Sequence, residues 1–456
     1  MKGLTLANIA RVTGGRYSGP DSELATEVQS ITTDSRKATE GSLFVAIKGE
    51  RVDGHKFIPQ VIEAGATAVL SEQDLGQQPY PYILVESTLQ AVKDIAEFYR
   101  QQLGLPVVGI VGSVGKTSTK EMTCSVLSQR YDVLKTEGNF NNELGVPLTI
   151  FRLREHHQLA VLEMGISHFG EMHRLTKIAR PDTVIMTNIG YAHLENLKTR
   201  DGILKAKSEV FDFLKPDAHI IVNGDDDKLS TIKEVHGIKP IRFGFAETND
   251  VWASNLHSLG LKGTTCTVHT HEGSFDVTVT LPGRHMVLNA LAGTAAGLTY
   301  GLTLDQIKAG IEANESLAGR FNIIEAKHYT IIDDCYNASP ASMKASLEVL
   351  QDGANRRVAI LGDMAELGPT EVALHAGVGE HAAGLKVDAV YCAGPLTKAL
   401  ADKVTELAPG KEVKHYATRD ELIGALPSLL HEGDTILVKA SHCMGFEQVV
   451  TWLQQH

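Results

Sequence analysis

The stretch that decides the fold runs from residue 106 to residue 123 and reads PVVGIVGSVGKTSTKEMT. Its opening segment, residues 107–111, is apolar and rich in β-branched side chains, which predicts a buried strand. Residues 112–117 read GSVGKT, and the segment after them has Met122 and Val126 about one helical turn apart. A strand, a glycine loop and a helix in this order form a phosphate-binding loop, because free backbone N–H groups and a helix N-terminus favour anions.

The residues that this loop would place on nucleotide phosphates are Gly112, Ser113, Val114, Gly115, Lys116, Thr117 and Ser118. Lys116 is expected to reach the β- and γ-phosphates, and the Thr117 hydroxyl to bind Mg²⁺. The complete motif has a glycine five residues before Gly115, where this chain has Ile110, so the match is to the shorter variant G-x-x-G-K-T. The alternative is an ordinary connection between a strand and a helix. The preceding strand, the Lys–Thr pair and the following helix favour nucleotide binding.

The composition narrows the class of protein. A chain of 456 residues is too long for one ordinary core, so about two to four domains are expected. Its 43% hydrophobic and 21% charged residues are typical of a soluble globular protein, and its net charge of −12 argues against bulk binding to nucleic acid or anionic membrane. Scattered cysteines without a C-x-x-C pair, no apolar run of membrane-spanning length and no signal-peptide pattern predict a cytoplasmic protein with reduced thiols.

Residues 1 to about 85 are predicted to form a small α/β unit. Within it, short segments between residues 32 and 55 bring together hydroxyl groups, cations and glycines. This combination can hold a diphosphate or a sugar nucleotide. The alternative is a polar loop closed by a salt bridge between Asp34 and Arg36, and residue chemistry alone does not decide between the two.

After the phosphate-binding loop, apolar strands alternate with helical segments, and polar residues follow the strands. Glu163 ends one strand, Asn188 follows another and Asp225 follows a third. Open parallel sheets place their ligands at the carboxyl ends of strands, so this pattern predicts a parallel sheet with helices on both faces. Residues 241–283 turn β-rich and alternate in polarity, as antiparallel strands do. We expect residues 86–317 to form this central ATP-binding domain with its β-rich extension.

From about residue 318 the rhythm of strand and helix returns and predicts a doubly wound, Rossmann-like domain. The segment GDMAELG at residues 362–368 lacks the spacing of a dinucleotide fingerprint, so no nicotinamide or flavin cofactor is expected. The predicted fold class is therefore α/β with three domains, at residues 1–85, 86–317 and 318–456.

Three titratable residues of the central domain need a common explanation: Glu163, His193 and Lys207. A glutamate at a strand end, together with Thr117, makes a hard oxygen site for Mg²⁺ beside phosphates. His193 by itself suits a structural histidine, and Lys207 a surface charge on a probable helix where Lys205 points to a different face. Taken one at a time, these ordinary explanations would be favoured.

Taken together and in order, the motifs of all three domains resemble those of the Mur ligase family of peptidoglycan synthesis. The matching segments are TDSR at 33–36, GSLFVAIKG at 41–49, DGH at 53–55, GSVGKT at 112–117, GNFNNELGVP at 138–147, EMG at 163–165, AHLE at 192–195, KAK at 205–207, GRH at 283–285, NA at 289–290, GR at 319–320, DDCYNA at 333–338 and LGDMAELG at 361–368. The chain departs from the family at His442, where relatives usually have an arginine, and at Lys198, where small residues are common. If that arginine binds a substrate carboxylate, His442 would bind it more weakly and with pH dependence.

The resemblance implies roles for individual residues. One Mg²⁺ would be held by Thr117 and Glu163, and a second by His193 and a carbamylated Lys207; Lys116, His193 and Lys207 would be catalytic. Further residues that would contact ATP are Asn142, Asn289, Arg320 and Asp334. Residues that would bind the UDP-sugar substrate in the first domain are Ser35, Arg36, Phe44, Lys48, Gly49, Asp53 and His55. Tyr336 and Asn337 of the third domain, which would bind the incoming amine, complete the predicted site.

The resemblance also implies an activity, that of an ATP-dependent, ADP-forming ligase. It would add D-alanyl-D-alanine to UDP-N-acetylmuramoyl-tripeptide through an acyl phosphate. The choice of this activity within the family depends mainly on segments 334–338 and 362–368. The alternatives are another Mur-type ligase that adds a single amino acid and, from a different class, a P-loop ATPase without ligation chemistry. A cytoplasmic monomer that acts on small molecules, with no nucleic-acid or membrane partner, is expected.

Overall fold

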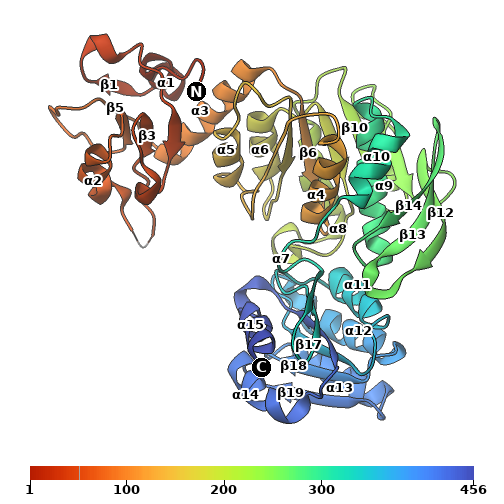
Figure 1. Cartoon of the computed structure of the whole chain (residues 1–456). Helices are drawn as coiled ribbons and strands as arrows, with labels where there is room; N and C mark the ends of the chain where they lie inside the picture. Colours follow the sequence, from red (N-terminus) through yellow and green to blue (C-terminus); the bar gives the residue numbers. More distant parts are fainter. Residues whose placement is uncertain (51) are drawn as a thin grey trace.

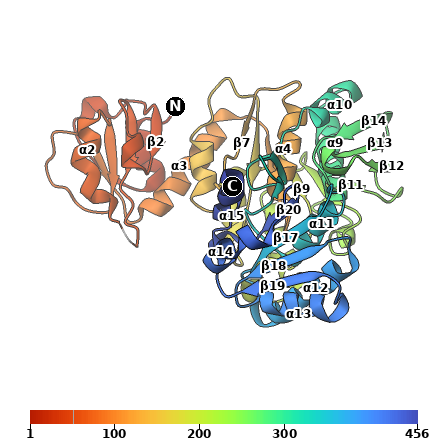
Figure 2. The ribbon, with the colours of Figure 1, turned by 60° about the horizontal axis from the view of Figure 1, so that its bottom comes forward.

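The computed structural model describes residues 1–50 and 52–456, and the chain forms three β-sheets one after another along the sequence. We call the parts built on these sheets the first, middle and third units. Figure 1 shows the first unit, in red and orange, beside the middle unit, and the third unit, in blue, below the middle unit. The turned view in Figure 2 again shows the first unit away from the third.

The first unit is a five-stranded sheet in the order β1-β5-β4-β3-β2, parallel except for the edge strand β1, which runs antiparallel to β5. Alternate residues of β3 face different cores: Leu43 packs with α1, and Phe44 packs with α2. Helix α1 begins where the Thr5 side chain accepts the Asn8 N–H, and it ends at Gly14, whose φ is 62°. The elements are α1 (Leu6–Thr13), β1 (Arg16–Ser18), β2 (Ser30–Thr32), β3 (Ser42–Val45), α2 (Ile58–Glu63), β4 (Ala68–Ser71) and β5 (Tyr82–Leu84).

The middle unit is a nine-stranded sheet in the order β14-β13-β12-β11-β10-β9-β6-β8-β7. The strands from β12 to β7 in this order pair in parallel, whereas β12, β13 and β14 are antiparallel to one another. The predicted β-rich extension therefore continues the same sheet. The strands are β6 (Val107–Val111), β7 (Val133–Lys135), β8 (Leu159–Glu163), β9 (Thr183–Met186), β10 (His219–Asn223), β11 (Ile241–Gly244), β12 (Val251–Ser258), β13 (Thr264–Thr270) and β14 (Gly273–Val279).

The helix after the phosphate-binding loop, α4 (Lys116–Leu127), packs against α9 (Arg284–Thr299). The approach is close, because a Cβ atom at Gly293 of α9 would lie 3.2 Å from the Met122 side chain. Met122 and Val126 are both buried in the core under β6, as their spacing predicted. The other helices of this part of the chain are α3 (Thr88–Leu103), α5 (Gly145–Ile150), α6 (Glu171–Ala179), α7 (Leu194–Leu197), α8 (Arg200–Ser208) and α10 (Leu304–Glu312).

The third unit is a six-stranded sheet in the order β15-β16-β20-β17-β18-β19, parallel except for β15. Helices cover both of its faces: Leu361 of β17 shares a core with α11 to α13, and its neighbour Ile360 shares another with α14 and α15. The elements are β15 (Asn322–Glu325), β16 (Thr330–Asp333), α11 (Pro340–Leu350), β17 (Arg357–Gly362), α12 (Glu371–Gly384), β18 (Ala389–Ala393), α13 (Thr397–Leu407), β19 (Glu412–Tyr416), α14 (Arg419–Leu429), β20 (Thr435–Lys439) and α15 (Glu447–Gln455).

The predicted α/β architecture with a doubly wound third part is confirmed. The predicted boundary at residues 85 and 86 falls between β5 and α3, and that at residues 317 and 318 falls between α10 and β15. The functional division of the chain at these points stays a prediction. None of the helices in the described ranges has both the length and the apolar character that crossing a membrane requires.

Candidate active site

A cavity of about 1070 Å³ lies between the middle and third units. Its walls include most of the site residues that the sequence predicted in these units: Ser113, Val114, Gly115, Lys116, Thr117, Ser118, Asn142, Glu163, His193, Asn289, Arg320, Asp334, Tyr336 and Asn337. Gly112 and Lys207 do not line the cavity, and neither do the predicted substrate-binding residues of the first unit. The structure therefore brings the phosphate-binding loop, the carboxyl end of β8 and the third unit together, but not the first-unit residues.

The phosphate-binding loop connects β6 to α4, and geometry requires its glycines. At Gly112 a Cβ atom would lie 1.9 Å from the Thr187 hydroxyl oxygen, and Gly115 has a φ of 81°. In the described part of the chain, the backbone N–H groups of Gly115, Lys116 and Thr117 have no hydrogen-bond acceptor. The N-terminus of α4 is therefore open to an anion, as a phosphate-binding loop requires.

Lys116 lies at the start of α4, where its ammonium group donates to the Gly112 carbonyl over 3.1 Å. Burial lowers the pKa of Lys116; the nearby Glu163 carboxylate raises it, and the Arg320 guanidinium lowers it further. Two cations from different units thus face one region of the cavity. Converging cations stabilise the charge on a transferring phosphoryl group.

Glu163 ends β8 with one carboxylate oxygen engaged and the other free. Its Oε1 accepts the Asn141 amide over 2.7 Å, and its buried Oε2 has no hydrogen-bond partner among the described residues. Leaving a buried carboxylate oxygen unpaired is costly, whereas a hard cation would satisfy it. Thr117, only 9% exposed, lines the same cavity. The oxygen donors present therefore fit a Mg²⁺ ion.

His193 precedes α7 in the left-handed conformation, with a φ of 60°. Its Nδ1 lies 2.6 Å from a carboxylate oxygen of Glu366, a residue of the third unit, and 3.3 Å from the Ser167 hydroxyl. Burial lowers the pKa of His193; Glu366 raises it, and Lys207 and Lys116 lower it. The neutral imidazole that results has a lone pair for a metal ion.

Lys207 lies on α8 with only 1% of its surface exposed, whereas Lys205 on the same helix is exposed. Within the described residues, no carboxylate oxygen lies within 4.0 Å of the Lys207 ammonium nitrogen, although buried lysines are normally paired. Burial lowers the pKa of Lys207 well below its usual value, and the charge of Lys116 adds to this effect. Lys207 therefore lies behind the cavity wall, where burial favours its neutral amine form.

The third-unit wall of the cavity contains Arg320, Asp334 and Tyr336. The Arg320 guanidinium lies 4.1 Å from the centre of the Tyr336 ring. The centre of the His442 ring, which follows the neighbouring strand β20, lies 5.3 Å from the centre of the same Tyr336 ring. The buried Asp334 carboxylate accepts the Lys439 ammonium and, over 2.7 Å, the Ser346 hydroxyl. This ion pair fixes Asp334 in place at the edge of the cavity.

The predicted UDP-sugar residues form a separate group on the first unit. Arg36 donates to both carboxylate oxygens of Asp34, over 2.9 and 2.8 Å, so the salt bridge considered as the alternative is present. The Phe44 side chain is 1% exposed and packs in the core, which leaves only its backbone for ligand contacts. His55 Nδ1 lies 2.7 Å from an Asp53 carboxylate oxygen, and Lys48 is exposed nearby, with Ser35 and Gly49 in the same loops.

Sequence reasoning assigned no role to several residues that support the site. The Thr136 hydroxyl accepts the Glu163 N–H over 3.0 Å, and the Thr136 carbonyl accepts the buried Lys120 ammonium over 2.6 Å. Glu366 and Lys439 were also missed. Lys439 ends β20 and Glu366 closely follows β17, so the carboxyl ends of parallel strands were the signal that could have found them.

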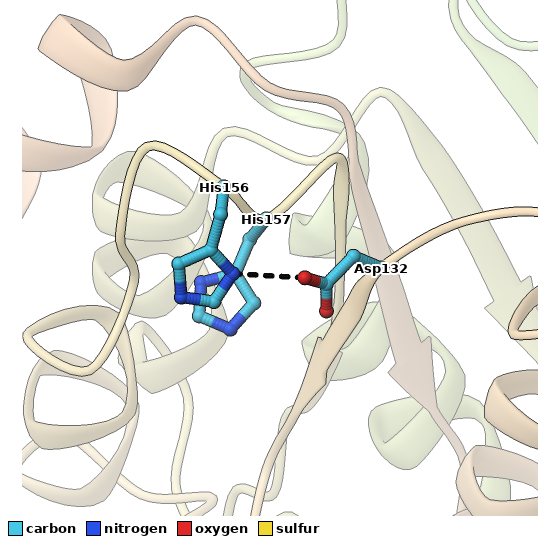
Figure 3. A group of neighbouring side chains, drawn as sticks. All are labelled: Asp132, His156 and His157. Carbon is cyan, nitrogen blue, oxygen red and sulfur yellow. Dashed lines mark hydrogen bonds and ion pairs between the residues drawn. The ribbon is translucent and has the colours of Figure 1, made fainter.

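A second group of metal-ligating side chains, Asp132, His156 and His157, lies at the amino ends of β7 and β8, away from the cavity (Figure 3). His156 Nδ1 lies 2.8 Å from an Asp132 carboxylate oxygen. His157 Nδ1 accepts the Arg154 N–H over 2.9 Å, which places the proton of this neutral ring on Nε2. Neither nitrogen of His157 then has a free lone pair, and we assign no metal to this group.

Comparison with known proteins identifies the family of all three units. Models of the Mur ligase family match along the chain: its catalytic domain at residues 27–107, the middle domain at residues 110–297 and the glutamate ligase domain at residues 319–442. The chain is 39% identical over 461 residues to UDP-N-acetylmuramoyl-tripeptide--D-alanyl-D-alanine ligase of Escherichia coli (100% of this chain, 99% of the relative). It is 37% identical over 451 residues to the ligase of the same name from Bacillus subtilis (98% and 97%).

Solved structures agree with this comparison. The structure of MurF from Acinetobacter baumannii superposes with a TM-score of 0.89 at 34% identity, over 99% of each chain. That of MurF ligase from Thermotoga maritima in complex with ADP superposes with a TM-score of 0.82 at 31% identity, over 94% of this chain and 97% of the other. The chain therefore belongs to the Mur ligase family.

Proposed function

We propose that the chain is an ATP-dependent ligase that adds D-alanyl-D-alanine to UDP-N-acetylmuramoyl-tripeptide in peptidoglycan synthesis. The observation that carries the proposal is full-length similarity to ligases with this name, joined to a phosphate-binding loop that faces the third unit across one cavity. The ADP in the complex of the Thermotoga maritima relative supports ATP as the phosphoryl donor. Neither a single-amino-acid ligase nor a non-ligating ATPase is favoured by these observations.

The proposed reaction has two steps. A carboxylate is a poor electrophile, so the γ-phosphoryl group of ATP first passes to a carboxylate oxygen of the tripeptide and gives an acyl phosphate and ADP. The incoming ammonium group first releases one proton, and the neutral amine nitrogen then bonds to the acyl carbon. Phosphate leaves with the electron pair of the C–O bond and takes up the second proton of the nitrogen. The free amides of the loop, Lys116 and Arg320 would bind the phosphates and stabilise their charge. The cavity wall formed by the third unit would keep water from the acyl phosphate.

We also propose two Mg²⁺ sites beside the loop. Thr117 and the free Oε2 of Glu163 would hold one ion, and His193 together with a carbamylated Lys207 would hold the other. When bound, Mg²⁺ supplies positive charge to the phosphate oxygens. Asn141 would keep the Glu163 carboxylate in place through its hydrogen bond to Oε1, and Thr136 would hold the Glu163 backbone by accepting its N–H.

Within this proposal, residues 1–85 bind the UDP part of the substrate, residues 86–317 bind ATP, and residues 318–456 bind the incoming dipeptide. We further propose a monomer, because residues of a single chain complete the cavity. A cytoplasmic location is supported by the cysteines, all of which are free, and by the need for ATP. Small molecules, rather than nucleic acid or membrane, are its proposed partners, in keeping with the net charge of −12.

The function is tested by measuring phosphate release from ATP with purified UDP-N-acetylmuramoyl-tripeptide and a series of acceptors. We expect release to require both the tripeptide and D-alanyl-D-alanine, with a product heavier by the dipeptide in mass spectrometry. Faster release with a single amino acid would assign the chain to another Mur-type activity. Release that needs neither acid nor amine would instead make it a simple ATPase.

The first-unit assignment predicts the effect of Arg36→Ala. Because Arg36 is exposed and Asp34 is its one ion-pair partner in the described part of the chain, its guanidinium can turn to a diphosphate. We expect the KM for the UDP-sugar substrate to rise about tenfold or more, with the KM for ATP unchanged. The control is Arg16→Ala, which removes another exposed Arg–Asp pair of the same unit, that with Asp74. Equal changes in both KM values would make Arg36 a structural residue.

A further inference from the structure

Glu366 of the third unit contacts the middle unit at its proposed metal-binding histidine. Its carboxylate oxygen lies 2.6 Å from His193 Nδ1, and the side chain lines the cavity. Glu366 has a φ of 62° and His193 a φ of 60°, so two non-glycine residues in the left-handed region face each other across the cavity. Such conformations are uncommon and concentrate at functional sites, which points to a role for this contact.

The loop that carries Glu366 is held against the middle unit by backbone contacts. At Gly368, which has a φ of 66°, an added Cβ atom would lie 3.3 Å from the Glu195 Cα and 3.4 Å from its nitrogen. The segments that follow β17 and His193 therefore touch without intervening side chains. This contact places the Glu366 carboxylate at the junction where the third unit meets the phosphate-binding side of the cavity.

Glu366 differs from the other carboxylates of the cavity in its partners. Two of the others form ion pairs, Glu143 with Lys93 and Arg174, and Asp334 with Lys439. Glu171 accepts two backbone N–H groups. Glu163 accepts the Asn141 amide and faces the proposed metal site. Among the described residues, the one titratable nitrogen within 4.0 Å of the Glu366 carboxylate belongs to the His193 imidazole, whose neutral form burial favours. Glu366 is also 54% exposed at its side chain, so a ligand can reach it.

The charge of the cavity explains why a free carboxylate is needed there. Lys116 and Arg320 line the cavity without an ion-pair partner among the described residues and favour phosphates, but the same cations repel a positively charged acceptor. The amino group of a dipeptide is an ammonium ion at neutral pH. A carboxylate beside the phosphate-binding side would bring that ammonium to the place where the acyl phosphate forms.

We propose that Glu366 binds the ammonium group of the incoming dipeptide and holds its nitrogen beside the acyl phosphate. This inference rests on the proposed function, since it specifies how the acceptor of that reaction is recognised. Glu366 belongs to the unit proposed to bind the acceptor, whereas His193 belongs to the unit that binds ATP. The contact between them thus marks the place where the acceptor nitrogen, once its ammonium group has released a proton, meets the acyl phosphate.

The test is Glu366→Gln, which keeps the shape and removes the charge. We expect the KM for D-alanyl-D-alanine to rise about tenfold to a hundredfold, with the KM values for ATP and the UDP-sugar substrate within about twofold of wild type. Binding of propionyl-D-alanine, the same dipeptide without its amino group, is measured alongside by inhibition. Wild type should prefer the dipeptide over this analogue, and Glu366→Gln should lose that preference. Glu380→Gln, an exposed glutamate on α12, is the matched control.

Several results would overturn the inference. An unchanged KM for D-alanyl-D-alanine in Glu366→Gln would overturn it. Equal weakening of the binding of the dipeptide and of its analogue would also overturn it, because it indicates a structural role. A shift confined to the Mg²⁺ concentration needed for half-maximal rate would show that Glu366 acts on the metal site. If wild type uses another amine instead of D-alanyl-D-alanine, the proposed function fails. The same comparison with that amine and its desamino analogue then still decides the role of Glu366.

Discussion

Lys116→Ala is expected to lower the turnover number about a hundredfold or more while the protein stays folded. Lys116 is a cation of the phosphate-binding loop, and within residues 1–50 and 52–456 its ammonium makes one hydrogen bond, to the Gly112 carbonyl. Because burial already lowers the pKa of Lys116, removing the charge relieves a desolvation cost, so the melting temperature should stay the same or rise slightly. Steady-state phosphate release and a thermal melt measure the two effects.

The control for this variant is Lys239→Ala, which removes an exposed lysine of the middle unit that precedes β11. It should leave both the turnover number and the melting curve unchanged. Near-normal turnover of Lys116→Ala, with a normal melting curve, would contradict the assignment of the loop to phosphoryl transfer. A large loss of melting temperature would instead show that Lys116 supports the fold.

Lys207→Ala is expected to be nearly inactive, and short carboxylic acids such as formate or acetate should restore part of the rate. A lysine ammonium has no lone pair for Mg²⁺ and would be repelled by it. Carbon dioxide adds only to the neutral amine, and burial of Lys207 lowers its pKa, which favours this form. The carbamate has two oxygens and a negative charge, which suit a hard cation and which an added acid can partly replace.

The modification itself can be observed without an activity assay. With ¹³C-labelled bicarbonate, wild type should show a carbamate carbon signal by NMR, and Lys207→Ala should not. Lys205→Ala is the matched control, because Lys205 lies on the same helix but is exposed, so its variant should keep both the signal and the rate. Full activity of Lys207→Ala, or no carbamate signal in wild type with nucleotide and Mg²⁺ present, would rule the carbamate out.

The phosphate-binding loop could be predicted because its signal is local. The strand, the glycines and the Lys–Thr pair occupy one continuous stretch, and Gly112 and Gly115 are required by contacts and dihedral angles within or next to it. Glu163 was predictable for a related reason: the carboxyl ends of parallel strands meet at one edge of a sheet. The helical period similarly separates Lys205 from Lys207, although only the structure shows which of them is buried.

Local sequence did not decide which contacts a side chain makes where two arrangements were both available to it. Arg36 had a diphosphate or Asp34 as possible partners, and the structure pairs it with Asp34. Phe44 was predicted as a substrate contact, which stays a prediction; the alternation of β3 turns its side chain into the core and leaves its backbone for that contact. The contacts of a side chain depend on which face of its strand or helix is covered, and the neighbouring elements determine which face that is.

By itself, then, the sequence determined the order of strands and helices, the phosphate-binding loop and the family, because these follow from short-range patterns and motif spacing. Only the tertiary structure decided which distant residues meet. His193 and Glu366 lie far apart in sequence and in different units, yet their side chains are 2.6 Å apart. The first unit, in contrast, contributes no described residue to the lining of the cavity. The physical reason is that interfaces between units are built from a few contacts between surfaces of separate cores, which leave no periodic pattern in the chain.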